Sequence, residues 1–288
     1  MQIKTSITRR SLIYATTALF TQRIGNAFAA FSIREQAALT DTLQDTPAIA
    51  TILHQQSGKV LATHGNTDFA DTPGSILKPL LLFAALQQNM IDHAVTVFCR
   101  RNLRIGNQSY PCTHPQSDIA FTAREALAYS CNTWFASLAL RFTPSGLTEA
   151  LRIFHLYPGM TPTSPDQIQL IALGLAGVRT SPSQIAIAYH MLSRKLNQAF
   201  AKPVADGLRD SVIFGMAHSA DVPGINISGK TGTSTNPPWQ PWSHGWFAGF
   251  VTTDRTPIVI SLYLPQGNGA DAAHLARKFF MLRNKTTT

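Results

Sequence analysis

The chain has 288 residues, of which 44% are hydrophobic and 14% charged, and its formal net charge is +9. This composition excludes a largely disordered protein, because it supplies enough apolar side chains to bury a sizeable core. The basic residues are scattered along the chain and do not form a cluster. They therefore do not predict a nucleic-acid-binding protein, and they are compatible with an anionic, cell-wall-like polymer as partner.

The N-terminus has the three parts of an export signal. Basic residues (Lys4, Arg9 and Arg10) precede an apolar stretch over residues 12–20, and residues 27–29 read Ala-Phe-Ala, a small-x-small cleavage site. The paired arginines also resemble a twin-arginine signal. We therefore expect an exported, periplasmic protein. An uncleaved membrane anchor is the alternative, although the apolar stretch is short for a bilayer span.

Hydrophobic patterns divide the rest of the chain into early strands, a helical middle and a late set of strands. Helices are expected over residues 36–43, 75–89, 123–129, 132–142, 146–156, 165–173, 182–195, 204–218 and 271–283. Strands are expected over residues 48–53, 60–63, 95–99, 224–234, 246–252 and 257–264. This order implies one sheet whose edges are completed from both ends of the chain.

The helix over 75–89 begins with a serine and a lysine three places apart on one face, Ser75 and Lys78. The helix is apolar almost all round, which predicts that it is buried. A buried lysine has a lowered pKa and can accept the proton of a nearby serine. In isolation, an N-cap serine followed by an ordinary lysine explains the pair equally well, because about one such pair is expected by chance in a chain of this length.

Two further motifs favour a catalytic interpretation of Ser75 and Lys78. Ser130-x-Asn132 stands between two predicted helices, and Lys230-Thr231-Gly232 lies within a predicted strand. Each motif alone is explained by a helix cap or a turn. In this order and in these contexts, they resemble the motifs of the penicillin-binding protein transpeptidase and serine β-lactamase superfamily, a resemblance that extends over residues 48–280.

The resemblance implies an α/β (α+β) fold. It consists of a mixed, mainly antiparallel sheet flanked by helices and an all-helical subdomain, with the active site in the cleft between them. The export signal is then 1–29 and the catalytic domain 30–288. The sheet part comprises about 48–70 and 196–288, and the helical part about 71–195.

The family chemistry also implies roles for individual residues. Ser75 is the expected nucleophile and Lys78 the base that activates it. Ser130 relays a proton towards the leaving amine. The backbone N–H groups of Ser75 and Thr233 are the expected donors to the oxyanion.

The remaining site residues are expected to bind substrate. Asn132 hydrogen-bonds the substrate backbone, and Lys230 polarises Ser130 and holds a substrate carboxylate. Thr231 and Thr233 contribute hydroxyl donors. Gly232 lacks a side chain, which lets the substrate lie against the strand as an added strand.

The choice of reaction depends on the acyl acceptor. The chain has no E-x-x-L-N segment of the kind that class A β-lactamases use for hydrolysis, and class D enzymes place a valine where Asn132 stands. The segments around residues 112–114 and 130–135 are similar to class B, elongation-type penicillin-binding proteins, although their N-terminal pedestal domain is missing here. We therefore expect a serine D,D-transpeptidase that acts on D-Ala-D-Ala peptidoglycan stem peptides, takes β-lactams as covalent ligands and needs no cofactor. A non-turnover sensor or acyl-trap, and a D,D-carboxypeptidase or β-lactamase-like hydrolase, are the alternatives.

Three cysteines remain to be explained. Cys99 and Cys112 bracket a short polar loop and form a possible disulfide in an oxidising compartment, whereas Cys131 stands alone. Cys99 and the Cys112-x-His114 pair also suggest a zinc site, but no fourth ligand is apparent in the sequence. We therefore expect no metal.

Overall fold

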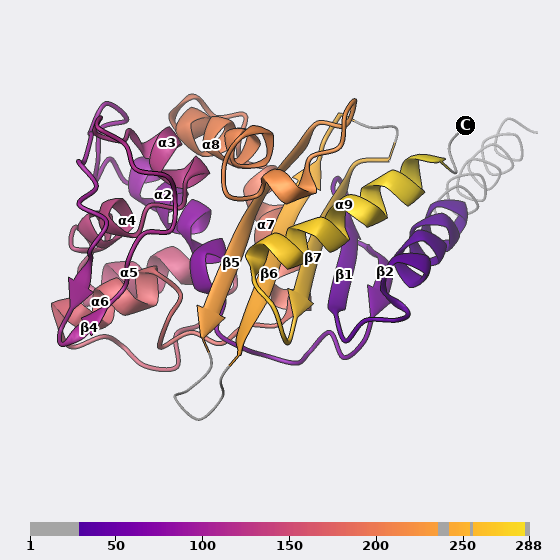
Figure 1. The fold of residues 1–288 in the computed structure, drawn as a ribbon, viewed down its shortest axis with the longest axis horizontal. Coiled ribbons are helices and arrows are strands. Elements are labelled where there is room, and N and C mark those ends of the chain that lie inside the picture. The colour runs from indigo at the N-terminus through magenta and orange to yellow at the C-terminus, as the bar shows by residue number, and fades with distance from the viewer. Residues whose placement is uncertain (1–28, 236–241, 254–255, 286–288) are drawn as a thin grey trace, which may run out of the picture.

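The computed structural model describes residues 29–235, 242–253 and 256–285, which form a sheet-centred part beside a helical part (Figure 1). The predicted export signal lies outside these residues, apart from its last position. No helix within the described ranges combines the length and apolar character needed to cross a bilayer.

The sheet has five strands in the order β2-β1-β7-β6-β5. Their bounds are β1 Ile49–His54, β2 Val60–His64, β5 Ile227–Thr235, β6 Ser243–Val251 and β7 Ile258–Leu264. The N-terminal hairpin joins the C-terminal strands where β1 pairs with β7, with Thr51 opposite Ser261. This confirms a sheet built from both ends of the chain. Every pairing within the five strands is antiparallel, and β5 forms one edge.

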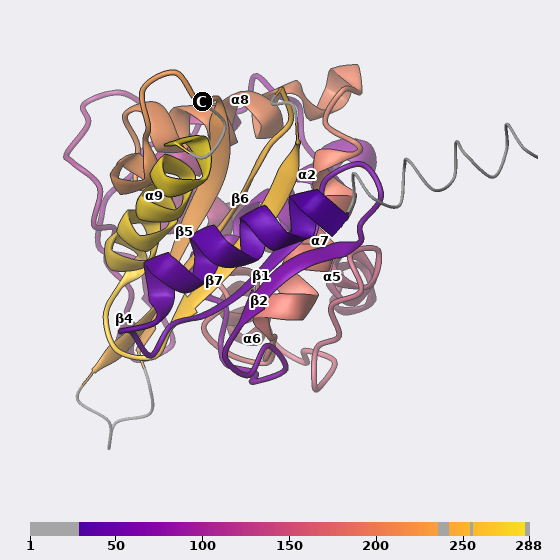
Figure 2. The same cartoon turned by 90° about the vertical axis from the view of Figure 1, so that its right-hand side faces the viewer.

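Helices cover both faces of the sheet. On one face, a helix over residues 29–43 and α9 (Gly269–Lys285) lie side by side (Figure 2). They bury an apolar cluster that includes Leu39 and Phe279. On the other face lies α7 (Pro182–Ser193), which packs against β1, β6 and β7. The sheet is therefore enclosed, which explains why β7 is buried along its whole length.

The helical part lies beside β5 and has six helices in the described ranges. These are α2 (Lys78–Gln87), α3 (Ala123–Ala128), α4 (Asn132–Ala139), α5 (Pro144–Arg152), α6 (Pro165–Ala172) and α8 (Lys202–Ile213). Shorter elements are the 3₁₀ turns η1 (Gly74–Leu77), η2 (Ala199–Ala201) and η3 (His218–Ala220) and the hairpin of β3 (Arg104–Ile105) and β4 (Gln108–Ser109). As predicted, α2 is buried almost all round and forms the centre of this part.

Two local predictions are wrong. Ser75 does not cap the buried helix, because residues 74–77 form the 3₁₀ turn η1 and α2 begins only at Lys78. The N–H of Lys78 donates to the carbonyl of Ser75, and among the described residues the serine hydroxyl makes no cap hydrogen bond to η1 or α2. The expected strand over 95–99 is reduced to a single bridge between Val97 and Phe121, because that extended segment finds no second pairing partner in the described chain.

Candidate active site

The nucleophile candidate Ser75 lies on a turn that is pressed against the edge strand β5. Gly74, just before it, has φ +58°, and a Cβ there would lie 2.8 Å from the carbonyl oxygen of Thr233. The Gly74 N–H donates to the carbonyl of Gly174 at 2.9 Å. Only glycine combines this dihedral with so close an approach. The backbone therefore holds Ser75 next to the Thr233 segment without the help of a cap.

The structure gives a reason for glycine at position 232 that differs from the expected one. A Cβ at this position would lie 2.5 Å from the carbonyl oxygen of Pro73, on the turn that carries Ser75. The missing side chain thus lets β5 approach the nucleophile turn. The prediction that it makes room for a substrate strand is not needed to explain the residue.

Lys78 is wholly buried and points to the turn between α3 and α4. Its Nζ lies 2.8 Å from the Ser130 carbonyl oxygen, 2.7 Å from Asn132 Oδ1 and 3.3 Å from Ser130 Oγ. No carboxylate of the described residues lies within ion-pair distance of it. Burial lowers the pKa of Lys78 to about 8, and the nearby Cys131 acts in the opposite direction. A neutral amine is therefore accessible near neutral pH.

The turn at residues 130–132 is itself strained. Ser130 has φ +57°, in the left-handed region that a non-glycine residue seldom adopts. The N–H of Cys131 donates to the carbonyl of Ala126 at 2.9 Å, and α4 starts at Asn132. This conformation turns both the carbonyl and the hydroxyl of Ser130 towards the lysine, as expected of strain stored at a functional site.

Both ends of the Asn132 amide contact protein groups. Its Oδ1 accepts from Lys78, and its Nδ2 donates to the carbonyls of Tyr110 and Pro111, each at 3.3 Å. Asn132 also lines the groove, and its contact with the substrate backbone stays a prediction. The side chain positions Lys78 against the loop that borders the cleft.

Lys230 is buried completely and does not line the cleft. Its Nζ donates to the carbonyl of Thr231 at 3.0 Å, and burial together with the charge of Lys78 holds its pKa well below the usual value. The side chain thus lies beneath the site, where a substrate carboxylate does not reach it in this conformation. The expected contact between Lys230 and a substrate carboxylate stays a prediction, and it would require the amine to leave the Thr231 carbonyl.

Thr231 and Thr233 project from the same side of β5 into the cleft. The Thr231 hydroxyl donates to the Met216 carbonyl at 3.2 Å. The Thr233 hydroxyl accepts from the Gly269 N–H at 2.9 Å, which leaves its proton available to a ligand. Of the two hydroxyl donors predicted, Thr233 is the one free to donate.

These groups meet in a groove of about 440 Å³. Five predicted residues line it, namely Ser75, Ser130, Asn132, Thr231 and Thr233. Its other walls come from residues that the sequence did not indicate: Gln108, Ser109, Tyr110, Pro111, Thr113, Leu175, Met216 and Thr235. The only sequence signal for the 108–113 wall was the pair of cysteines that brackets its loop.

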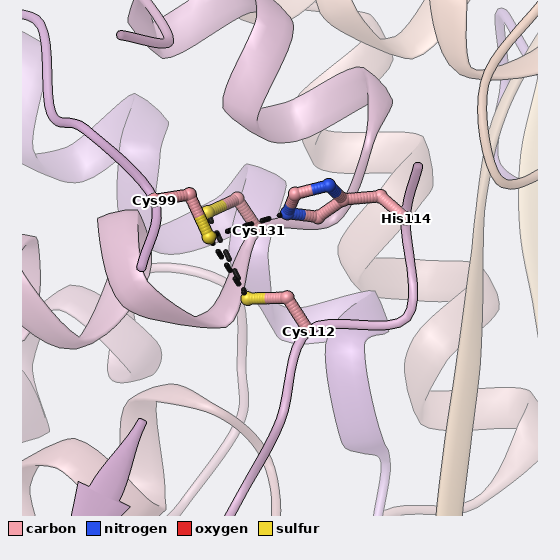
Figure 3. A group of neighbouring side chains, drawn as sticks. All are labelled: Cys99, Cys112, His114 and Cys131. Carbon is pink, nitrogen blue, oxygen red and sulfur yellow. Dashed lines mark hydrogen bonds between the residues drawn. The ribbon is translucent and has the colours of Figure 1, made fainter. Parts of the chain in front are cut away.

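A second cluster of reactive side chains lies directly behind the 130–132 turn (Figure 3). The Cys99 Sγ is 3.4 Å from the Cys112 Sγ and 3.4 Å from His114 Nε2, and the Cys131 Sγ is 3.9 Å from the Cys112 Sγ. All three cysteines are free and buried, so the predicted Cys99–Cys112 disulfide is not formed in this structure. The Cys99 and Cys112 sulfurs are 3.4 Å apart, well beyond the S–S bond length of about 2.05 Å, and both also contact a third group of the cluster.

The sequence profile of the penicillin binding protein transpeptidase domain matches residues 48–281, so the chain belongs to this family. The match covers both halves of the groove, from the hairpin before Ser75 to the last helix. The domain is of the serine acyltransferase superfamily, and the match supports a penicillin-binding, peptidoglycan transpeptidase-type function. No curated protein matches the sequence.

Solved structures share the fold at low sequence identity. The transpeptidase domain of Burkholderia pseudomallei penicillin-binding protein 3 is 15% identical with a TM-score of 0.74, and the match covers 91% of this chain and 95% of that one. Pseudomonas aeruginosa PBP2 is 16% identical with a TM-score of 0.75, over 88% and 74% of the two chains. A chain of a peptidoglycan synthase complex is 20% identical with a TM-score of 0.71, and 88% of this chain spans 60% of its length.

Proposed function

We propose that this protein is a serine D,D-transpeptidase that cleaves the D-Ala-D-Ala end of peptidoglycan stem peptides and passes the acyl group to an amine. The observation that carries the proposal is the environment of Lys78. Its buried amine lies between Ser130 and Asn132, with a pKa lowered to about 8, beneath a groove that exposes Ser75. This combination supports a nucleophilic serine with a basic amine near it.

In the acylation step, the Ser75 hydroxyl oxygen attacks the carbonyl carbon of the penultimate D-alanine. Neutral Lys78 accepts the hydroxyl proton, and the N–H groups of Ser75 and Thr233 stabilise the oxyanion. The carbon–nitrogen bond to the terminal D-alanine then breaks. Ser130, whose Oγ is 3.3 Å from Lys78 Nζ, relays the proton to the leaving amine.

Transfer reverses this sequence with a new amine. The acceptor amine loses a proton through Ser130 to Lys78 and attacks the acyl-serine, and Ser75 regains its proton as the ester bond breaks. The edge position of β5 supports binding of the stem peptide as an added strand beside Thr231 and Thr233. A β-lactam presents the same carbonyl and would remain covalently bound to Ser75.

Labelling with a fluorescent penicillin tests the nucleophile. We expect covalent label on the wild-type protein and none on Ser75→Ala, while the variant keeps the circular dichroism of the wild type. Equal labelling of both proteins would show that Ser75 is not the nucleophile.

Incubation with a D-Ala-D-Ala pentapeptide tests the reaction. We expect release of D-alanine and formation of a cross-linked product when an amine acceptor is present. Release without an amine product would assign a carboxypeptidase, and rapid loss of penicillin label would assign a β-lactamase. Persistent label without release of D-alanine would assign an acyl-trap or sensor.

The proposed place of action is the periplasm, on the basis of the basic, apolar and Ala-Phe-Ala segments before residue 30. Fractionation of cells that express the whole chain with a C-terminal tag tests it. Tagged protein in the periplasmic fraction, shortened at its N-terminus, is the expected result. Tagged protein confined to the cytosol would contradict it.

A further inference from the structure

The cluster behind the 130–132 turn brings together four metal-binding side chains from three separate segments of the chain. One ligand atom from each of Cys99, Cys112, His114 and Cys131 lies within 4.8 Å of the others, and all four residues are buried. In a tetrahedral zinc site, Zn–S bonds of about 2.3 Å and Zn–N bonds of about 2.0–2.1 Å put the ligand atoms about 3.5–3.8 Å apart. The contacts of 3.4, 3.4 and 3.9 Å in the cluster match that spacing.

The imidazole of His114 is already oriented as a ligand. Its Nδ1 lies 2.7 Å from the carbonyl oxygen of Pro115, which only accepts hydrogen bonds, so Nδ1 carries the proton. The other ring nitrogen, Nε2, faces Cys99 Sγ at 3.4 Å. A hydrogen bond from the other ring nitrogen to a carbonyl is the usual support of a metal-bound histidine.

The sulfur atoms are also surrounded by donors that suit thiolates. The N–H of Asn132 donates to Cys112 Sγ at 3.2 Å, and the N–H of Arg101 donates to Cys99 Sγ at 3.4 Å. The Thr133 hydroxyl accepts from the Cys99 thiol at 3.5 Å, lies 3.7 Å from Cys112 Sγ, and can donate once the sulfurs have lost their protons. A neutral thiol does not require so many donors, whereas a metal-bound thiolate is stabilised by them.

We propose that the protein binds one structural zinc ion through the side chains of Cys99, Cys112, His114 and Cys131. The donor set of three thiolates and one imidazole is a closed tetrahedral set of the structural type. Cys131 is the fourth ligand that is not apparent in the sequence, because it lies 17 positions beyond His114 and within a catalytic motif. On binding, three thiols release their protons and Zn²⁺ takes their place, with no change of oxidation state.

The site joins three structural units. Cys99 and the 112–114 segment lie at the two ends of the loop that carries β3, β4 and the 108–113 wall, and Cys131 lies between Ser130 and Asn132. One ion would therefore hold the wall of the groove to the turn that contacts Lys78. In this way zinc acts as a positioning element for the catalytic groups and does not itself contact the substrate.

Metal analysis of the purified full chain tests the proposal without any activity assay. After expression with zinc and removal of loose metal by dialysis, we expect one zinc per chain and three titratable thiols once the metal is chelated and the protein denatured. Replacement by Co²⁺ is expected to give the visible d–d bands and the thiolate charge-transfer band of tetrahedral sulfur coordination. Absence of bound zinc and of the cobalt spectrum would overturn the proposal, as would a count of only one thiol, which means a disulfide.

A matched pair of histidine variants separates binding at the cluster from surface binding. His114→Gln removes a buried ligand, whereas His93→Gln removes an exposed histidine outside the cluster. We expect the first variant to lose the zinc and the second to keep it. Equal zinc content in both would overturn the site. If His114→Gln does not fold, chelation of the wild type followed by titration with Zn²⁺ provides the same comparison.

Two readouts keep this proposal apart from the proposed function. Ser75→Ala is expected to keep its zinc and to lose penicillin labelling. Chelated wild type is expected to keep Ser75 but to label up to about 100-fold more slowly, since a displacement of about 1 Å in a catalytic group has an effect of that size. Unchanged labelling after complete removal of the metal would refute the positioning role and leave the binding result intact.

Discussion

Two buried cations on opposite sides of the sheet differ in how their charge is compensated. Beneath α9, Arg283 is 3% exposed, and its Nε lies 2.9 Å from both carboxylate oxygens of Glu35. It also donates to the carbonyl of Thr256. On the side of the groove, Lys78 is fully buried, and its hydrogen-bond partners among the described residues are uncharged acceptors on Ser130 and Asn132.

The difference separates a structural charge from a reactive one. A buried charge needs a partner of opposite sign to offset the loss of hydration, and Arg283 has one. Lys78 lacks a carboxylate partner among the residues described, so its neutral form is favoured and its pKa falls to about 8. The helical side thus bears an energetic cost that the α9 side avoids, and such a cost is expected where a free amine is used in chemistry.

The largest effect is expected from Lys78→Arg. The variant keeps the positive charge but removes an amine that can lose its proton, so acylation by a fluorescent penicillin should fall by about 10²- to 10⁴-fold. The second-order labelling rate measures this. A rate within a few fold of the wild type would place the base elsewhere. Thermal unfolding of the variant shows whether the longer side chain is tolerated.

Arg283→Met should lower the stability of the protein and leave the acylation of Ser75 unchanged. Removal of the arginine leaves the buried Glu35 carboxylate with Arg34 as its one remaining ion-pair partner among the described residues, which should lower the free energy of unfolding by up to about 3 kcal/mol. Labelling per folded molecule should stay at the wild-type level. The double variant Glu35→Gln with Arg283→Met is the control and should recover most of the loss. A single variant as stable as the wild type would show that the pair contributes little.

The pH dependence of acylation should report the pKa of Lys78. Because the neutral amine is the base, the labelling rate should rise about tenfold per pH unit below the pKa and level off above about 8. Stability has the same sign: the unfolded lysine keeps its proton up to its ordinary pKa, so stability gained from this group rises with pH above about 8. A lysine base would be contradicted by a labelling rate that stays constant between about pH 6 and pH 8.

The smallest effects are expected at two helix caps. Thr122 caps α3 through Glu125, and Ser181 caps α7 through Gln184, each in a reciprocal capping box. Thr122→Ala and Ser181→Ala should each lower the free energy of unfolding by about 1 kcal/mol. Only Thr122→Ala should also slow labelling by a few fold, because α3 leads into the Ser130 turn. Equal labelling by both variants would show that the cap is not coupled to the site.

The elements that could be predicted are those whose signals are local. The predicted helix starts at residues 123 and 182, the apolar run after Lys78 and the apolar runs of β6 and β7 each depend on a few neighbouring residues. The groove residues Ser75 and Ser130 could be predicted because their motifs occur in a recognisable order. Both serines line the same groove in the structure, and Ser130 contacts Lys78.

Other features depend on contacts between distant segments and have no local signal. Cys131 joins Cys99 only through the packing of α3 and α4 against the loop before β3. The burial of Lys230 depends on β5 lying against the turn at Gly74. The 3₁₀ turn at Ser75 replaces the expected cap for the same reason, since the chain is shaped there by its neighbour across the groove.

The glycine contacts between β5 and the nucleophile turn also decide which side of the groove can adapt. Cβ atoms at Gly74 and Gly232 would meet backbone oxygens at 2.8 and 2.5 Å. The backbones of the two segments are therefore already in contact, and neither segment can shift towards the other. Acyl side chains of different size must therefore be accommodated by the opposite wall, at residues 108–113. Selectivity among penicillins, cephalosporins and stem peptides should then follow the composition of that loop, whereas the backbone beneath Ser75 should stay rigid.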